Sequence, residues 1–234
     1  MLRKIPKDQR KKKILDGVEK LILQKSSTDF TMYQLAEFVG ISPTTFYNLF
    51  GSKGAVLYSL LNRGLDQIIS YQDDGPESDD PISFAIYGMT HAAKIFVEKP
   101  GLYRPLYKFQ LGERDMGARP FYLDRALIYW KRNLDGLVER GYLQDDPADG
   151  SFSRDDVALA LLTHSSGVID LWVQEDIDNE EFVARMTHDA ALLVYAVVPD
   201  SERRKIEEII ASVRPQIRKF SFLRKNAPHE ARKK

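Results

Sequence analysis

Apolar residues recur at steps of three and four positions along most of this 234-residue chain, which is the period of an amphipathic helix. Between Gln9 and Leu23, one face collects Ile14, Val18, Leu21 and Ile22. The same pattern predicts further helices at about 53–71, 82–98, 101–111, 119–140, 153–174, 179–198 and 201–222. No segment alternates as a strand does and no internal repeat is found, so we predict an all-α protein.

The most informative segment runs from Phe30 to Lys53 (FTMYQLAEFVGISPTTFYNLFGSK). Thr31 followed by Gln34 predicts a capping box at a helix start. Gly40 can adopt the left-handed backbone that a tight turn between two helices requires. Ser42 predicts a second N-cap, and the proline after it stands where a missing N–H costs nothing. Together these features predict a helix-turn-helix.

The short second helix of this motif has one apolar face, formed by Phe46, Leu49 and Phe50. Its remaining residues are compact donors and acceptors: Ser42, Thr44, Thr45, Tyr47 and Asn48. A helix presented in this way fits the major groove of DNA, where its N-terminal residues meet base edges. The segment is therefore predicted to bind duplex DNA.

Charge is divided unevenly along the chain although its formal net charge is zero. Residues 1–63 hold 11 Lys and Arg against 5 Asp and Glu, residues 64–202 hold 12 against 26, and residues 203–234 hold 11 against 3. A basic end attracts a polyanion, whereas the acidic middle should lie away from it. The basic arm from Arg3 to Lys13 is expected to attract phosphates generally, which makes binding depend on salt.

Over about residues 10–60 the chain resembles the TetR/AcrR family of transcriptional regulators. The residues that carry the resemblance are Phe30-Thr31, Leu35-Ala36, Val39-Gly40-Ile41-Ser42, Thr45-Phe46-Tyr47, Phe50 and Ser52-Lys53. The resemblance implies an N-terminal three-helix DNA-binding domain followed by a helical ligand-binding and dimerisation domain. We place these at residues 1–52 and 53–224, with a connecting helix at 53–71 and a polar, acidic boundary segment at 72–81; residues 225–234 form a basic tail predicted to be disordered.

The resemblance also implies roles for single residues of the motif. Contacts to the DNA backbone are assigned to Thr31, Thr45, Tyr47 and Lys53, and contacts to base edges to Ser42, Pro43, Thr44 and Asn48. Two alternatives stay open. Thr31 and Ser42 can act as helix caps, which does not exclude a DNA contact, and Tyr47 can pack against the core of the motif.

Residues 82–143 are rich in aromatic side chains, many of them with a polar tip. Such residues around a helical cavity suit a small, partly apolar ligand, although each one can also be plain core. The candidates for a ligand site are Phe84, Tyr87, His91, Tyr103, Tyr107, Tyr122, Trp130 and His164. The acidic excess leaves a cationic ligand open, although most carboxylates are expected on solvated faces.

The predicted helices at 153–174 and 179–198 have apolar stripes that are wider than one core face needs. The resemblance implies that this pair builds a four-helix dimer interface. The candidates are Leu161, Val168, Leu171, Trp172, Met186, Ala190, Leu193 and Val194. The alternative is that both helices bury these residues only against their own chain. A two-fold dimer would place two recognition helices about one DNA turn apart, which implies a pseudo-palindromic operator.

The sequence offers little for catalysis or metal binding. It has no cysteine, none of its four histidines lies in an HExxH arrangement, and neither a phosphate-binding glycine loop nor GxSxG occurs. The longest apolar run, Ala190 to Val198, is too short for a membrane span, and no signal-peptide core follows the basic N-terminus. We therefore expect no enzyme activity, no cofactor, no metal, no membrane partner and a cytoplasmic location.

The sequence thus predicts a DNA-binding transcriptional regulator that acts as a homodimer. The expected partners are a double-stranded DNA operator, a second copy of the chain and an unidentified small-molecule effector. The aromatic-rich, acidic helical body favours a ligand response, whereas repression rather than activation follows from the resemblance alone. An architectural or cell-cycle DNA-binding protein of the same fold, without a small-molecule switch, is the alternative, and only a response to ligand separates the two.

Overall fold

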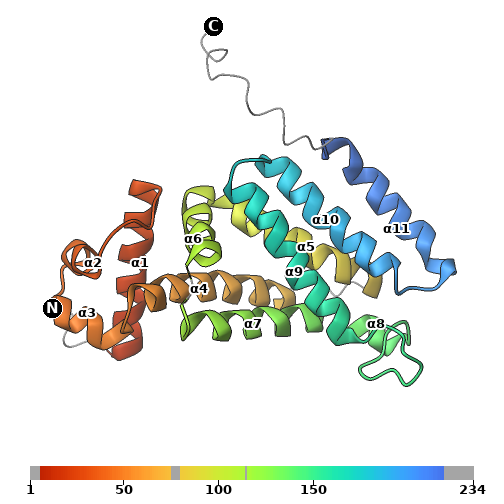
Figure 1. Ribbon diagram of the computed structural model, residues 1–234, viewed down its shortest axis with the longest axis horizontal. Coiled ribbons are helices and arrows are strands. Elements are labelled where there is room, and N and C mark those ends of the chain that lie inside the picture. The colour runs from red at the N-terminus through yellow and green to blue at the C-terminus, as the bar shows by residue number, and fades with distance from the viewer. Residues whose placement is uncertain (1–5, 75–79, 114, 219–234) are drawn as a thin grey trace, which may run out of the picture.

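The computed structural model describes residues 6–74, 80–113 and 115–218, and within these ranges the regular structure is helical (Figure 1). This confirms the all-α prediction. The elements are α1 (Lys7–Lys25), α2 (Met32–Val39), α3 (Pro43–Phe50), α4 (Lys53–Asp74), α5 (Pro81–Glu98), α6 (Pro100–Gly112), α7 (Ala118–Asn133), α8 (Asp135–Glu139), α9 (Arg154–Val173), α10 (Asn179–Tyr195), α11 (Asp200–Val213) and the 3₁₀ turn η2 (Arg214–Gln216).

Helices α1, α2 and α3 form a small head at one end of the molecule (Figure 1, left). Their apolar faces meet in a core whose central residues, Ile14, Val18, Leu35 and Phe46, are at most 1% exposed. Because each helix contributes only one face to this core, the opposite faces of α2 and α3 lie at the surface. The head is the predicted helix-turn-helix with one supporting helix.

Helix α4 runs from the head into the remaining helices, which we call the body (Figure 1). The guanidinium group of Arg63 on α4 forms ion pairs with Asp16 and Glu19 of α1. Lys99, at the start of α6, also pairs with Glu19 at 3.1 Å. The head is therefore held by the connecting helix and by a second element of the body.

In the body, α10 packs against α5, α9 and α11, while α9 packs against α6, α7 and α10. Trp172 of α9 stacks on Phe182 of α10 with ring centroids 4.7 Å apart, and both rings are fully buried. Among the described residues, α9 alone has a length and mean hydropathy that would also suit a membrane span. Its packing on three neighbouring helices is that of a core helix.

Two predicted helices differ from those observed. The helix expected at 119–140 is divided at Leu134 into α7 and α8, where the side chain of Asn133 turns back to donate to the Tyr129 carbonyl at 2.9 Å. The helix expected at 201–222 ends at Val213 and passes into the 3₁₀ turn at Arg214, because Pro215 has no backbone N–H to continue the α-helical hydrogen bonds. Residues 1–5 of the basic arm, 75–79 of the boundary segment and the predicted tail at 225–234 lie outside the described residues.

Candidate nucleic-acid interface and body cavity

The start of α2 is fixed by the capping box that the sequence predicts. The Gln34 backbone N–H donates to the Thr31 hydroxyl at 3.2 Å, and the Thr31 N–H donates to the Gln34 side-chain oxygen at 2.8 Å. Both hydrogen bonds use groups that would otherwise lack a partner at a helix start. The Thr31 side chain remains exposed at this end of α2.

The turn between α2 and α3 depends on Gly40, whose φ of 72° lies in the left-handed region. It lets the Ile41 N–H reach back to the Ala36 carbonyl at 3.0 Å, which closes the end of α2. Ser42 then caps α3 by accepting from the Thr45 N–H at 3.2 Å. The chain reverses within three residues, and α3 is presented at the surface of the head.

The outer face of α3 carries the predicted contact residues. Ser42, Thr44, Tyr47 and Asn48 are exposed, whereas Pro43 and Thr45 are half-buried. The Ser42 and Thr45 hydroxyls lie 2.8 Å apart and form a hydrogen bond with each other. Tyr47 is 51% exposed, so the packing alternative does not account for its position.

Lys53 lies at the first position of α4, directly after Ser52, whose hydroxyl caps this helix by accepting from the Ala55 N–H at 3.0 Å. The ammonium group of Lys53 lies 5.7 Å from the centre of the buried Phe30 ring. This cation–π contact directs the charge toward the edge of the head beside α2. Tyr33, in the first turn of α2, is also exposed, at 64%, and it is not among the candidate residues predicted from the sequence.

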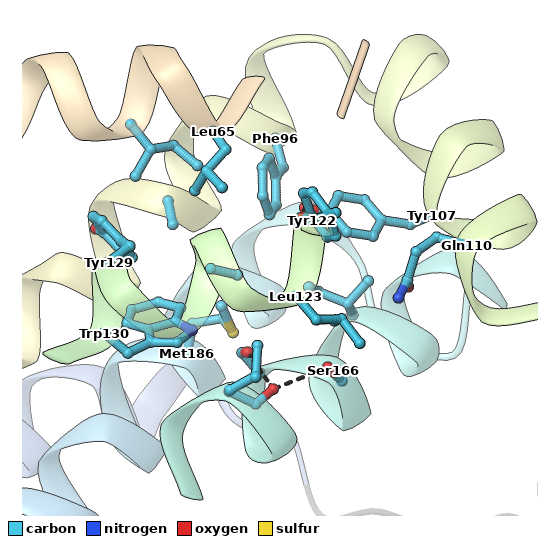
Figure 2. A pocket seen from close by; sticks show the side chains of 16 residues that line it. Leu65, Phe96, Tyr107, Gln110, Tyr122, Leu123, Tyr129, Trp130, Ser166 and Met186 are labelled. Atoms are coloured by element: carbon cyan, nitrogen blue, oxygen red, sulfur yellow. Dashed lines mark hydrogen bonds between the residues drawn. The ribbon is translucent and has the colours of Figure 1, made fainter. Parts of the chain in front are cut away.

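The body contains a small cavity of about 40 Å³ that is lined from six helices, α4, α5, α6, α7, α9 and α10 (Figure 2). Figure 2 shows Tyr107, Tyr122, Leu123 and Gln110 at one end of it, and Tyr129, Trp130 and Met186 at the other. The further lining residues are Leu65, Ile68, Ala92, Phe96, Ala126, Leu162, Ser165, Ser166 and Ile169.

Two tyrosines dominate one end of this cavity. The hydroxyl groups of Tyr107 and Tyr122 are 2.8 Å apart and hydrogen-bonded to each other. Burial raises the pKa of Tyr122 to about 12 and the pKa of Tyr107 well above 10. Both rings therefore stay protonated and neutral at physiological pH.

The cavity brings together part of the predicted ligand set. Tyr107, Tyr122 and Trp130 line it. Tyr103 lies just outside, with its ring 5.0 Å from that of Phe96 and its hydroxyl donating to Gln67 at 3.4 Å. These four residues come from α6 and α7, where their side chains point toward the body core.

The other four predicted ligand residues lie elsewhere. On α5 the inner face is formed by Ala85, Met89, Ala92 and Phe96, so Phe84, Tyr87 and His91 fall outside it. Tyr87 is 48% exposed and lines a separate, more open groove between α5 and α10, and burial lowers the pKa of His91. His164 is half-exposed on α9, with its Nε2 3.2 Å from the carboxylate of Asp189. These four residues do not line the cavity, and their assignment to this site is corrected.

Most of the predicted dimer residues lie inside the body. Leu161, Val168, Trp172, Met186, Ala190 and Val194 are buried within one chain, and only Leu171 and Leu193 are half-buried. For these six residues the alternative holds, because α9 and α10 turn their widest apolar stripes toward α5, α6 and α7. Exposed apolar residues on the same two helices are Leu159 and Leu192.

The cavity and the head are joined through α4. The Tyr58 ring of α4 lies 5.9 Å from the rings of Tyr122 and Phe109, and its hydroxyl has no hydrogen-bond partner within the described residues. Nearer the head, Gly54 is so close to Asp115, in the α6–α7 loop, that an added Cβ would lie 2.0 Å from the carboxylate. The first turns of α4 therefore contact the α6–α7 loop as well as the rings of α6 and α7.

The described residues contain no group of three or more histidine, cysteine or acidic side chains that could hold a metal ion. The loop between α8 and α9 instead ends in a capping box, in which the Ser153 hydroxyl accepts from the Asp156 N–H at 3.1 Å. No catalytic cluster is apparent in the cavity lining, which carries only neutral side chains.

Comparison with solved structures relates this arrangement to one group of proteins. A TetR-family transcriptional regulator from Syntrophomonas wolfei superposes with a TM-score of 0.66 at 20% identity, covering 82% of this chain and 98% of the other. RolR in complex with resorcinol gives 0.61 at 19% identity, covering 86% and 93%, and a TetR regulator from Rhodococcus sp. RHA1 gives 0.59 at 16%, covering 80% and 97%.

No protein-family model matches the sequence, and a search of curated proteins finds no significant relative. At about one-fifth identity, the structural likeness shows the fold: this chain folds as the TetR-family transcriptional regulators do, over most of its length and theirs.

Proposed function

We propose that this protein is a DNA-binding transcriptional regulator that acts as a homodimer and whose affinity for a pseudo-palindromic operator changes when a small molecule binds in the body cavity. The observation that carries the proposal is the outer face of α3, with Thr44, Tyr47 and Asn48 exposed on a helix fixed by caps at its start. Such a helix is the reading element of a helix-turn-helix.

The surroundings of α3 support docking on DNA. Lys7, Lys12 and Lys13 are exposed on α1, and Lys53 lies at the start of α4. Within the head, the acidic side chains of Asp16 and Glu19 are paired with Arg63 and Lys99, so they repel phosphate less. In the proposed complex, Tyr47, Lys53, Thr45 and Thr31 bind the DNA backbone, and Ser42, Pro43, Thr44 and Asn48 face base edges.

This docking is tested with duplexes that the wild-type protein selects from a randomised pool. Tyr47→Phe and Lys53→Ala should weaken binding to all selected sequences, and Lys53→Ala should lower the slope of affinity against salt by about one. Tyr87→Phe is the matched control, because that tyrosine is equally exposed but lies on α5. If Tyr47→Phe and Lys53→Ala bind as the wild type does, the docking is wrong.

Base readout needs a separate measurement. Asn48→Ala should relax the preference at one base position of the selected sites. The difference in binding free energy between the preferred base and the other bases at that position should fall by about 1–3 kcal/mol. Selection from the same randomised pool reports this directly. An unchanged set of selected sites would exclude a base contact by Asn48.

For the dimer we propose the outer face of α9 and α10, which lie side by side in Figure 1. This face carries Leu159 and Leu192, both about half exposed, and Gly167, beside which space is open. Leu171 and Leu193 border it, and these two remain from the set predicted by sequence. Two copies packed through this face would form a two-fold, four-helix interface.

The dimer face is tested by Leu159→Glu, with Phe121→Glu on α7 as the control at an equally exposed apolar residue. Sedimentation should show a dimer for the wild type and the control, and a monomer for Leu159→Glu. A wild-type monomer at every concentration would refute the homodimer.

A ligand response is supported by the cavity and its contact with α4. A molecule that displaces Tyr122 also displaces the Tyr58 ring packed on it, and α4 begins at Lys53, at the edge of the head. A ligand shifts DNA affinity only by its differential affinity for the two arrangements. RolR, which shares the fold, was solved with resorcinol. Release of DNA by the ligand, and hence repression, is the direction implied by the resemblance to the TetR/AcrR family.

A further inference from the structure

We propose that the effector is an uncharged molecule of about one ring that carries a hydroxyl or carbonyl group, and that Gln110 binds this polar group beside the Tyr107–Tyr122 pair. The inference rests on the proposed function, because it names the ligand class of the same cavity. Three properties of the lining support it: the absence of formal charge, the amide of Gln110 and the volume.

The lining carries no formal charge. None of the sixteen residues around the cavity is Lys, Arg, Asp, Glu or His. Its tyrosines are held in the protonated form, as shown by the raised pKa of Tyr122. An ion transferred from water into such surroundings loses its hydration without gaining a partner, which is strongly unfavourable. The acidic excess of residues 64–202 therefore does not reach this cavity, and a cationic ligand does not fit it.

Gln110 supplies an amide to the lining. The residue is only 5% exposed, but its amide atoms are not among the fully enclosed polar atoms that lack a partner, so the amide keeps accessible surface where the residue lines the cavity. The neighbouring hydroxyls are already bound: Ser165 and Ser166 both donate to the Leu162 carbonyl, at 2.8 and 2.9 Å. An amide that borders the cavity can pair with a ligand group, and that hydrogen bond adds affinity in surroundings of low polarity.

The amide of Gln110 also defines which ligand groups suit it. Its nitrogen donates and its oxygen accepts, so it can pair with a hydroxyl, which does both, or with a carbonyl. The Tyr107 and Tyr122 hydroxyls lie at the same end of the cavity and share one hydrogen bond. Either hydroxyl can give up this bond and form one with the ligand instead. Gln110 and the tyrosine pair thus lie at the same end, while Trp130 and Met186 at the other end offer apolar contact.

The volume limits the ligand's size. About 40 Å³ holds only a few water molecules, whereas a cavity that accepts benzene measures roughly 150 Å³. A one-ring molecule therefore enters only if side chains yield. Leu123 and Met186 line the cavity and can change rotamer, and a shift of Tyr122 moves the Tyr58 ring. Larger ligands would need the helices themselves to separate.

Four one-ring probes of similar shape test this class: phenol, toluene, benzoate and benzylamine. Calorimetric titration of the full chain without DNA should show phenol binding most tightly, toluene about tenfold more weakly, and both ions more than about a hundredfold more weakly. If benzoate or benzylamine binds as tightly as phenol, or if none of the four binds, the inference is overturned.

Two variants locate the contact. Gln110→Leu should weaken phenol about tenfold and leave toluene unchanged. Gln67→Leu, an exposed glutamine outside the lining, should bind both probes as the wild type does. Thermal melting confirms that each variant is folded, and phenol affinity retained by folded Gln110→Leu would overturn the assignment. Because these titrations contain no DNA, they test the ligand class independently of DNA binding by the head. Either proposal can be overturned while the other stands.

Discussion

The head and the body cavity use polar groups in opposite ways. In the head, side-chain hydrogen bonds join residues that are three positions apart in the sequence, as Thr31 and Gln34 are. Ser42 and Thr45 form a second such pair, and the remaining donors face outward. In the cavity, polar contacts join distant parts of the chain: Tyr107 bonds Tyr122 of the next helix, and Tyr129 donates to the Gly88 carbonyl, 41 residues away. One site is a fixed surface, whereas the other is an interior that must rearrange to be used.

This difference assigns the two sites to different ligands. The exposed, basic head suits a polyanion that stays in water, where charge steers association and salt weakens it. The neutral cavity suits an uncharged molecule that leaves water. Because α4 belongs to both regions, through Lys53 in one and Leu65 and Ile68 in the other, binding in the cavity can alter the head.

Removing the core of the head should separate the two sites most strongly. Phe46→Ala empties the centre of the head and should cost about 3–5 kcal/mol of its stability, because Phe46 is fully buried. DNA binding should be lost, while the body still binds phenol. Phe38→Ala, at a 42% exposed aromatic of α2, is the control and should change stability by less than about 1 kcal/mol. Denaturant unfolding and calorimetry measure both, and a joint loss of the two activities would argue against separate sites.

Alkaline pH should destabilise the body before the head. Burial raises the pKa of Tyr103 and Tyr122 to about 12, whereas tyrosine in an unfolded chain ionises near 10. Their contribution is complete below pH 10 and is lost as pH rises toward 12, by about 2–3 kcal/mol for each residue. The two tyrosines of the head, Tyr33 and Tyr47, are exposed.

Circular dichroism during a pH titration measures this loss, with tyrosinate absorbance as the second probe. Tyr122→Phe should make stability fall less steeply between pH 10 and 12, and Tyr87→Phe should leave the slope unchanged. Equal slopes for all three proteins would show that the buried hydroxyls do not govern alkaline unfolding.

The smallest expected effect concerns the ion pairs between head and body. Arg63→Ala removes the pairs from α4 to Asp16 and Glu19 of α1 and should cost about 1 kcal/mol, since the side chain is partly exposed. Arg154→Ala, which also loses two acidic partners at similar exposure but lies far from the head, is the matched control. Only Arg63→Ala should change DNA affinity. If both variants bind DNA with the same affinity, the ion pairs of Arg63 do not control how the head is positioned on the body.

The contrast between the regions also explains what the sequence could predict. The caps at Thr31 and Ser42 and the turn at Gly40 depend on neighbours within a few residues, so the helix-turn-helix was predictable residue by residue. The cavity depends on how six helices meet, which periodicity does not determine. Aromatic content identified Tyr107, Tyr122 and Trp130, but nothing in the sequence marked Gln110 as a residue of the cavity lining.

The dimer prediction shows the same limit. An apolar stripe on α9 and α10 could face a partner or the same chain, and Trp172 and Met186 face their own body. Which stripe remains outside depends on the positions of α5, α6 and α7, and these follow from the whole fold.

The most direct test of the account is a phenol titration of the protein bound to a duplex selected from a random pool, followed by fluorescence polarisation. The account predicts that phenol releases DNA from the wild type and from Gln67→Leu, and that Gln110→Leu needs about tenfold more phenol for the same release. DNA binding that does not respond to phenol, or an identical response in Gln110→Leu, would contradict control of the head by the cavity.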